Sequence, residues 1–210
     1  MSAYAQREHP RHITLAITGA SGLQYGIRLL EMLLRADVRV SLLFSRAAHA
    51  VAALEMDWNL PSRHDELAAL FSERFGAADG QLRAYAREDW TAPIASGSNP
   101  PDAMVVCPCT TGTLAAIATG ISDNLIERAA DVVIKERRTL ILVPRETPYS
   151  AIHLEHMLNL ARLGVVILPP NPGFYHRPQT VDDLVDFVVA RILDQLAVPH
   201  QLMRRWGEEG

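Results

Sequence analysis

Residues 12–35 have the sequence HITLAITGASGLQYGIRLLEMLLR, in which an apolar run passes through a turn of small residues into a second apolar pattern. The run 13–17 is apolar apart from one threonine and rich in β-branched residues, which predicts a strand buried on both faces of a parallel sheet. Helical spacing then relates Leu23, Ile27, Leu30 and Leu34. This spacing predicts an amphipathic helix that packs against the sheet.

The turn 18–22 lies between the predicted strand and helix and has features of an anion site. It offers backbone N–H groups, two hydroxyls and a helix N-terminus, whose partial positive charge favours a phosphate. Its glycines do not form G-x-G-x-x-G, and no Gly-Lys-Ser/Thr follows, so nicotinamide and nucleoside triphosphate sites are not indicated. Two interpretations of Ser21 stay open here: it caps the helix, or it helps to bind a phosphate.

The composition is that of one globular domain spanning residues 1–210. With 49% apolar residues the chain can bury one substantial core, and no linker divides it. Residues 1–11 form a polar N-terminal extension, and residues 199–210 form a C-terminal tail. The large apolar groups Met203 and Trp206 in this tail either dock on a neighbouring subunit or pack on the same chain.

Charge and hydropathy exclude several classes of partner. A net charge of −4 argues against nucleic acid and anionic membranes. No apolar run reaches membrane-spanning length and residues 1–11 contain no apolar leader, so we expect a cytoplasmic protein. The only cysteines, Cys107 and Cys109, are too few for a zinc site and badly placed to bridge each other. The histidines show no metal-type spacing such as H-E-x-x-H.

Strands alternate with helices along the remaining chain. Further strands are predicted at residues 38–44, 82–85, 103–106, 139–143 and 165–168. Further helices are predicted at residues 47–55, 63–75, 114–119, 124–137, 151–163 with Ser150 as cap, and 181–196. This alternation predicts an α/β fold with a doubly wound parallel sheet, of the flavodoxin-like or Rossmann-like kind, in a three-layer sandwich.

In such sheets, ligands bind at the carboxyl ends of the strands, where the strand order reverses. We expect the loops at the carboxyl ends of the strands to bring together Ser21, Ser45, Trp90, Thr110 to Thr113, Arg145, Glu146 and Tyr175. Two anion-ready turns and Arg145 predict a ligand that carries phosphate. Lys135 and Arg191 would add charge if their helices point inward, and the alternative for each is a solvated surface position. For Trp90 the alternative is core filling.

Several long motifs resemble the bacterial UbiX-type flavin prenyltransferases. They are TGASG (18–22) followed by YG, PCTTGT (108–113), DNLIERAADVVIKERR (123–138), LVPRETP (142–148) and PGFYHRPQTVDDLVDFVVARILD (172–194). The similarity extends from about Ile13 to Trp206. One departure is that some relatives carry lysine where this chain has Arg191, which changes the phosphate-binding geometry.

The resemblance implies a homo-oligomer, usually a dodecamer, that binds FMN and dimethylallyl phosphate without a metal. The implied product is prenylated FMN, formed by bonds to N5 and C6 of reduced FMN and used by a UbiD-type decarboxylase, as in ubiquinone synthesis. The implied FMN contacts are Gly19, Ala20, Ser21, Ser45, Thr110, Thr111, Gly112, Thr113 and Arg145. The implied contacts of the prenyl phosphate are Lys135, Glu146, Tyr175 and Arg191. The implied catalytic residues are Ser21, Glu55, Trp90, Lys135 and Glu146.

The residue chemistry agrees with these implied roles. Cleavage of an allylic C–O bond leaves negative charge on phosphate, which cations and hydroxyls stabilise. The prenyl group becomes cation-like, and the aromatic face of Trp90 stabilises such charge. Loss of a ring proton requires a base, either Glu146 or the released phosphate, with Ser21 as relay. Two rival functions remain at this point: an FMN-dependent decarboxylase of cysteine-derived substrates, and a flavin carrier without chemistry.

Overall fold

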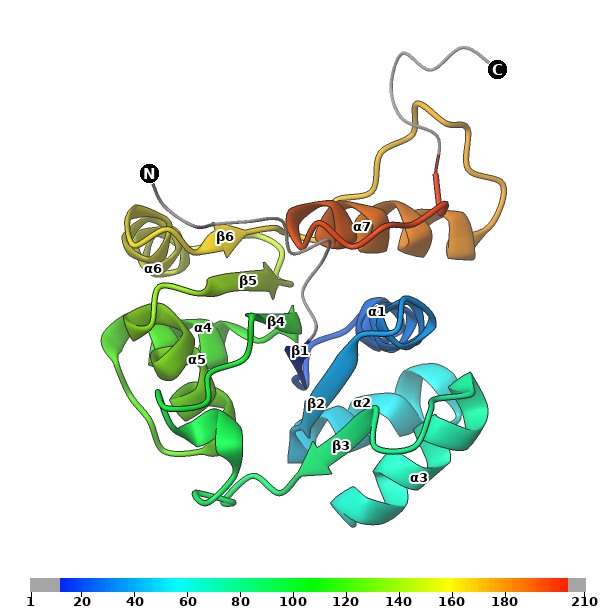
Figure 1. Ribbon diagram of the computed structural model, residues 1–210. Helices are drawn as coiled ribbons and strands as arrows, with labels where there is room; N and C mark the ends of the chain where they lie inside the picture. Colours follow the sequence, from blue (N-terminus) through cyan, green and yellow to red (C-terminus); the bar gives the residue numbers. More distant parts are fainter. Residues whose placement is uncertain (1–11, 204–210) are drawn as a thin grey trace, which may run out of the picture.

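The computed structural model describes residues 12–203, which form one sheet with helices on both faces (Figure 1). The strands are β1 (His12–Ile17), β2 (Arg39–Phe44), β3 (Leu82–Tyr85), β4 (Ala103–Cys109), β5 (Thr139–Pro144) and β6 (Val166–Ile167). They pair in the order β3-β2-β1-β4-β5-β6, and every pairing is parallel. The strand order reverses between β1 and β4. The predicted doubly wound α/β fold is therefore confirmed.

Seven α-helices and one short 3-10 helix connect the strands within the described residues. They are α1 (Leu23–Arg35), α2 (Arg46–Met56), α3 (His64–Phe75), η1 (Pro93–Ala95), α4 (Thr111–Thr119), α5 (Leu125–Lys135), α6 (Ala151–Arg162) and α7 (Val181–Gln195). The predicted start of α4 at residue 114 is wrong. Its side-chain cap is Thr110, which accepts a hydrogen bond from the Thr113 N–H, so the helix begins three residues earlier. The last strand is also shorter than predicted, since β6 has only two residues.

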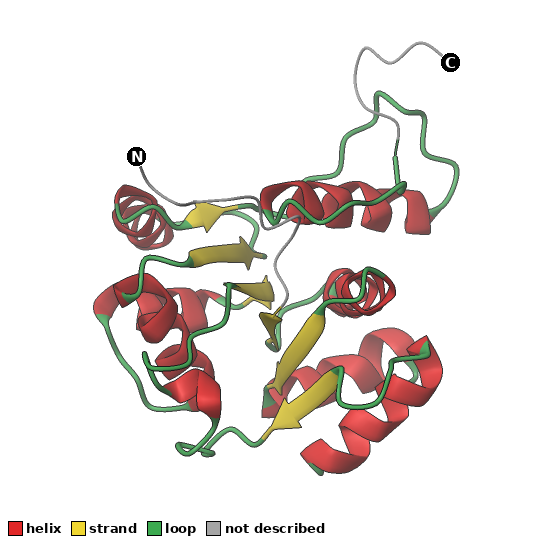
Figure 2. Cartoon of the chain, in the orientation of Figure 1, coloured by secondary structure: helices red, strands yellow, loops and turns green. Residues whose placement is uncertain are grey.

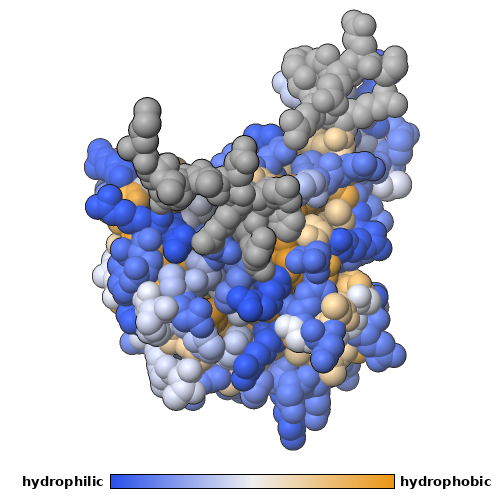
Figure 3. All heavy atoms as spheres, in the orientation of Figure 1, coloured by the Kyte–Doolittle hydropathy of each residue, from blue (hydrophilic) through white to orange (hydrophobic). Residues whose placement is uncertain are grey.

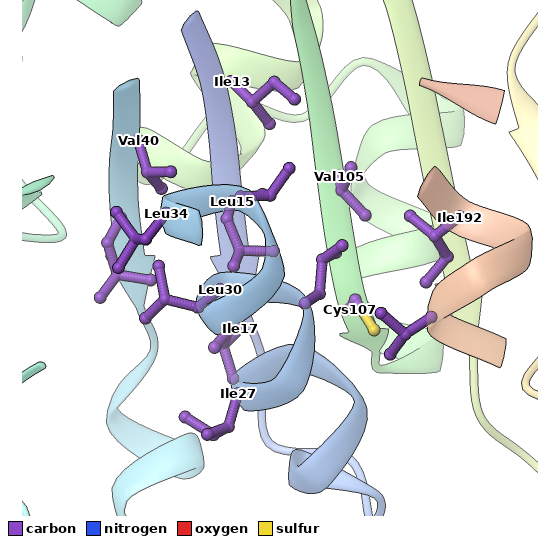
Figure 4. Packing of buried hydrophobic residues seen from close by; sticks show 14 of the residues in the cluster. Ile13, Leu15, Ile17, Ile27, Leu30, Leu34, Val40, Val105, Cys107 and Ile192 are labelled. Carbon is purple, nitrogen blue, oxygen red and sulfur yellow. The ribbon is translucent and has the colours of Figure 1, made fainter. Parts of the chain in front are cut away.

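Helices cover both faces of the sheet (Figure 2), and a separate apolar cluster is buried on each face. Alternate residues of β1 point to opposite faces, so Leu15 joins the cluster beneath α1 and α7, and Ala16 joins the one beneath α4 and α5. The first cluster also includes Ile27, Leu30 and Ile192 (Figure 4). Burial on both sides explains the nearly continuous apolar run in β1.

Two glycines near the turn 18–22 permit close packing of the backbone. A Cβ atom at Gly26 would lie 2.2 Å from the Cys107 carbonyl oxygen, so this glycine lets α1 approach β4. A Cβ atom at Gly19 would lie 2.3 Å from the Ala47 Cβ, so Gly19 lets the turn approach α2. Gly19 therefore places the turn against α2, and Gly26 places the helix that follows the turn against β4.

The first part of the C-terminal tail packs on its own chain. Val198, directly before the tail, is buried in the cluster beneath α1, and Leu202 within the tail lies against the same cluster. Met203 is half-buried, and Trp206 lies outside the described residues. Hydrophilic residues cover much of the face in Figure 3. No helix within residues 12–203 combines the length and apolar character needed to cross a membrane.

Candidate functional site

Thr18 joins the two predicted anion-binding turns where the strand order reverses. Its hydroxyl donates to the Pro108 carbonyl oxygen at 2.7 Å and accepts from the Thr110 N–H at 2.9 Å. Its own N–H donates to the same Pro108 oxygen at 3.2 Å. Thr18 is 2% exposed, so these bonds form out of contact with water and fix the relative position of the turns. This role of Thr18 was not predicted from the sequence, although a threonine directly after a buried strand is a signal for it.

Glu55 binds the N-terminus of α1 with its carboxylate. Its Oε2 accepts from the N–H groups of Gly22 at 2.9 Å and Leu23 at 3.3 Å. The N-cap residue is Gly22, in the left-handed region at φ 93°, and it makes no side-chain cap. Of the two interpretations of Ser21, helix capping is therefore wrong, because the Glu55 carboxylate from α2 accepts from these N–H groups instead. The Ser21 hydroxyl hydrogen-bonds to that carboxylate.

The charge state of Glu55 reflects these contacts. Partial burial raises its pKa, but the hydrogen bonds from Ser21, Gly22 and Leu23 and the nearby charge of Arg145 outweigh burial and leave the pKa below its ordinary value. Glu55 is therefore a carboxylate at neutral pH. The family resemblance implied a catalytic role for Glu55, but its contact with α1 follows only from the approach of α2.

Free backbone donors remain at the turn after β1 and at the start of α4. In the described part of the chain, the N–H groups of Gly19, Ala20, Thr111 and Gly112 have no hydrogen-bond acceptor. A Cβ atom at Gly112 would meet nothing closer than 4.0 Å, so the start of α4 is open. Ser45 caps α2 by accepting from the Ala48 N–H at 3.2 Å. Such donors at helix N-termini suit a phosphate group.

A pocket of about 370 Å³ lies beside the turn after β1. It contains four of the predicted site residues, namely Ser21, Glu55, Arg145 and Glu146. Its wall also includes residues that were not predicted from the sequence: Gln24, Tyr25, Tyr149, Asn171, Val181 and Val185. Gln24 and Tyr25 lie in the first turn of α1, directly after the predicted anion-binding turn. This position in the sequence could have indicated that they line the pocket. The position of Asn171 in a proline-rich loop gave no such signal.

Two tyrosines of the pocket are held in the phenol form. Partial burial, reinforced by Cys107, raises the pKa of Tyr25, which Arg145 opposes. Partial burial and the carboxylate of Glu146 raise the pKa of Tyr149. The Tyr149 hydroxyl donates to the Pro144 carbonyl oxygen at 3.1 Å. The pocket therefore presents neutral phenols beside one guanidinium and two carboxylates.

The predicted FMN contacts Gly19, Ala20, Ser45 and Thr110 to Thr113 lie outside this pocket. So do four residues assigned to the prenyl phosphate or to catalysis, namely Trp90, Lys135, Tyr175 and Arg191. Trp90 is 50% exposed and Tyr175 is 83% exposed, so core filling by Trp90 is wrong. Lys135 ends α5 four residues before β5 begins, at the amino edge of the sheet, and pairs with Glu136. Its helix does not carry it towards the turn after β1.

Arg191 is also turned away from the pocket. Of the two alternatives for Arg191, the solvated surface position is the one found within its own chain, because Val188 and Ile192 on the same helix are buried while Arg191 is exposed. Its guanidinium pairs with Asp194 at 2.6 Å. In the described residues, no three His, Cys, Asp or Glu side chains come together as a possible metal site.

Comparison with known proteins identifies the class of protein. A family model described as Flavoprotein matches residues 1–193. At 59% identity over 200 residues, the chain is similar to the flavin prenyltransferase UbiX of Pseudomonas aeruginosa, covering 95% of this chain and 96% of that protein. A Halalkalibacterium halodurans flavin prenyltransferase UbiX is 50% identical over 93% of each chain. This chain therefore belongs to the UbiX family of flavin prenyltransferases, which confirms the predicted family, enzyme class and flavin.

Solved structures agree with this family. The crystal structure of AnUbiX in complex with FMN and dimethylallyl pyrophosphate has a TM-score of 0.84 and 41% identity, covering 96% of this chain and all of that one. A dodecameric FMN-dependent UbiX-like decarboxylase from Escherichia coli O157:H7 has a TM-score of 0.82 and 44% identity, covering 94% of this chain and all of that one. The peptidyl-cysteine decarboxylase EpiD is only 17% identical, with a TM-score of 0.53, and shows the shared fold alone.

Proposed function

We propose that this protein joins the dimethylallyl group of dimethylallyl phosphate to N5 and C6 of reduced FMN. The observation that carries the proposal is the pocket at the turn after β1, which combines Arg145 with Ser21, Glu55 and Glu146. The relative AnUbiX, 41% identical, is described in complex with FMN and dimethylallyl pyrophosphate. Reduced FMN supplies the two nucleophilic ring atoms, and the chain supplies binding, charge stabilisation and proton transfer.

FMN fits the donors at this edge of the sheet. The free N–H groups of Gly19 and Ala20, and those that begin α4, suit an anion and the polar edges of a flavin ring. Ser45, Thr110 and Thr113 add hydroxyls, and the Arg145 guanidinium adds a cation. These are the proposed contacts, together with Ser21, Thr111 and Gly112.

The two carboxylates of the pocket have different proposed tasks. Glu55 is fixed by three hydrogen-bond donors and has a lowered pKa, which suits a permanent negative charge that stabilises cationic character in the prenyl group. Glu146 is freer, since its Oε1 accepts only from the Thr147 N–H in the described chain. We assign the proton of the flavin ring to Glu146 as base, with the Ser21 hydroxyl as relay.

The phosphate of the substrate requires cations that one chain does not bring to its own pocket. Arg145 is the cation of the pocket wall, and Glu55 and Glu146 oppose its charge. Because α5 runs back to the amino edge of the sheet, Lys135 reaches such a pocket only from another copy of the chain. Arg191 lies six residues, or about 9 Å along α7, beyond Val185, which lines the pocket, and its guanidinium pairs with Asp194. We therefore propose that neighbouring copies contribute Lys135, Arg191, Tyr175 and Trp90.

This shared site implies a closed homo-oligomer. The relative from Escherichia coli, at 44% identity, is described as dodecameric, and we propose the same assembly here. A UbiD-type decarboxylase would receive the prenylated flavin. The proposed location is the cytoplasm.

One experiment distinguishes this function from the two rivals. The full-length protein is mixed with reduced FMN and dimethylallyl phosphate, and the flavin is examined by mass spectrometry. We expect a C5 unit added to the flavin. Unchanged flavin with release of CO₂ from a cysteine-derived substrate would favour the decarboxylase, and unchanged flavin without any turnover would favour the carrier.

A further inference from the structure

A second hollow lies beside the amino ends of β5 and β6, at the end of the sheet opposite to the first pocket. Figure 1 shows these two strands next to each other. The volume of the hollow is about 530 Å³. Arg137 and Arg138 border it from the turn between α5 and β5, and Arg162 borders it from the end of α6. Leu140 and Val165 contribute buried apolar surface, and Leu163 is 67% exposed beside them.

The three guanidinium groups have no anionic partner in the described part of the chain. None of them forms an ion pair or side-chain hydrogen bond there, and no acidic residue borders the hollow. Other arginines of this protein do pair, such as Arg28 with Asp186 and Arg63 with Asp65. In a chain of net charge −4, the hollow is thus a local concentration of positive charge.

Compensation of helix dipoles explains only part of this charge. The C-termini of α5 and α6 lie at the hollow, and their partial negative charge stabilises nearby cations. Arg162 in the last turn of α6 fits that account. The last turn of α5 already contains Lys135, so Arg137 and Arg138 exceed what the helix end requires. The partial negative charge of the two helix C-termini instead reduces the repulsion among the three arginines when no anion is bound.

We propose that this hollow binds a small molecule that carries a phosphate or diphosphate group on an apolar body. Guanidinium groups match phosphate oxygens with paired N–H donors, and three of them suit two or more negative charges. The exposed side chain of Leu163, which lies beside the buried Leu140 and Val165, would contact the apolar part. The volume lies within the usual range for small-molecule sites.

The site is distinct from the prenyl-transfer pocket. The two share no bordering residue and lie at opposite edges of the sheet. Lys135 is close in sequence but does not border the hollow, and its ammonium group pairs with Glu136 beside Gly97. Substitution of Arg138 and Arg162 therefore leaves the proposed transfer residues unchanged.

Calorimetry on the FMN-loaded, full-length protein tests the proposal. Sodium diphosphate and dimethylallyl diphosphate are titrated into the parent and into the double variant Arg138→Gln/Arg162→Gln. We expect two binding events per chain in the parent, with one weakened at least tenfold in the double variant. The tighter ligand at the weakened site should be dimethylallyl diphosphate. A control variant, Arg35→Gln/Arg63→Gln, removes two exposed, ion-paired arginines and should bind like the parent.

Three results would overturn the proposal. The first is identical titration of parent and double variant. The second is loss of the oligomer in the double variant by light scattering, because the arginines would then belong to a contact between subunits. The third is equal affinity of that site for sodium diphosphate and dimethylallyl diphosphate, which would show that an apolar body contributes nothing to binding. We expect the double variant to prenylate flavin at the parent rate. Any of the three results would then count against this second site and leave the proposed function intact.

Discussion

Glu55 places a carboxylate at the helix N-terminus that the sequence marks as an anion site. The N–H groups of Gly22 and Leu23 are thereby satisfied, and free donors remain on the preceding residues Gly19 and Ala20. An anionic ligand would bind beside this carboxylate rather than in its place. The single residue Glu55 thus divides the turn into a part closed by the protein and a part open to a ligand.

Glu146 is the residue at which the proposed acid–base role can be tested most sharply. Glu146→Gln keeps the shape of the side chain but removes the base, so turnover should fall by roughly a hundredfold or more, while FMN affinity stays unchanged. Single-turnover kinetics and flavin titration measure the two quantities. Glu66→Gln, on the exposed side of α3, is the matched control. Parent-rate prenylation by the Glu146 variant would remove this residue from the mechanism.

At the scale of elements, the approach of α1 to β4 depends on Gly26. In Gly26→Ala the new Cβ would overlap the Cys107 carbonyl oxygen, which cannot move without disturbing β4. We expect the free energy of unfolding to fall by about 1–3 kcal/mol, despite the better helix propensity of alanine. Chemical denaturation checks this. Gly112→Ala, where the new Cβ is free, should leave stability unchanged, and equal stability of both variants would contradict the packing argument.

The amino end of β1 contains a buried histidine that makes the sheet sensitive to acid. His12 Nε2 lies 2.8 Å from Ser41 Oγ, and burial together with Arg39 lowers the pKa of His12 to about 4, although Asp102 opposes this. The unfolded histidine keeps a pKa of about 6.5. Between these values the unfolded chain takes up a proton that the folded chain does not, so stability falls as pH decreases.

We therefore expect His12 to lower the free energy of unfolding by up to about 3 kcal/mol from pH 7 to pH 4. Denaturation curves across this range measure the slope, and His12→Gln should have a shallower one. The remaining slope in that variant comes from groups that both proteins share, including His49, whose pKa is also lowered, mainly by burial. Parallel slopes would show that His12 does not titrate differently on unfolding.

At the scale of the whole molecule, a site shared between copies predicts complementation. Lys135→Met and Glu146→Gln each remove a proposed active-site residue, one from each edge of the sheet. If different chains supply these residues to one site, mixed oligomers regain activity in about one quarter of their sites. Activity is measured after the two variants are unfolded together and refolded, with each variant refolded alone as control. No recovery in verified mixed oligomers would place both residues in one chain.

The sequence by itself determined the order of the elements, the parallel sheet and the turns that face a ligand. These features depend on local patterns: the apolar run 13–17, the spacing of Leu23 and Ile27, and the small residues between them. It also determined that Arg145 and Glu146 follow a strand at its carboxyl end, because that position depends only on where β5 ends. Neighbours along the chain were sufficient for each of these inferences.

Only the tertiary structure decided which side chains meet. Glu55 reaches α1 from α2, Thr18 binds the turn after β4, and Asn171 enters the pocket from a loop, each across many residues of chain. It also decided that Lys135 and Arg191 turn away from their own pocket, because the direction of a helix and its buried face follow from packing against the sheet. Local patterns specify elements, whereas contacts between elements depend on how the faces of the sheet are covered.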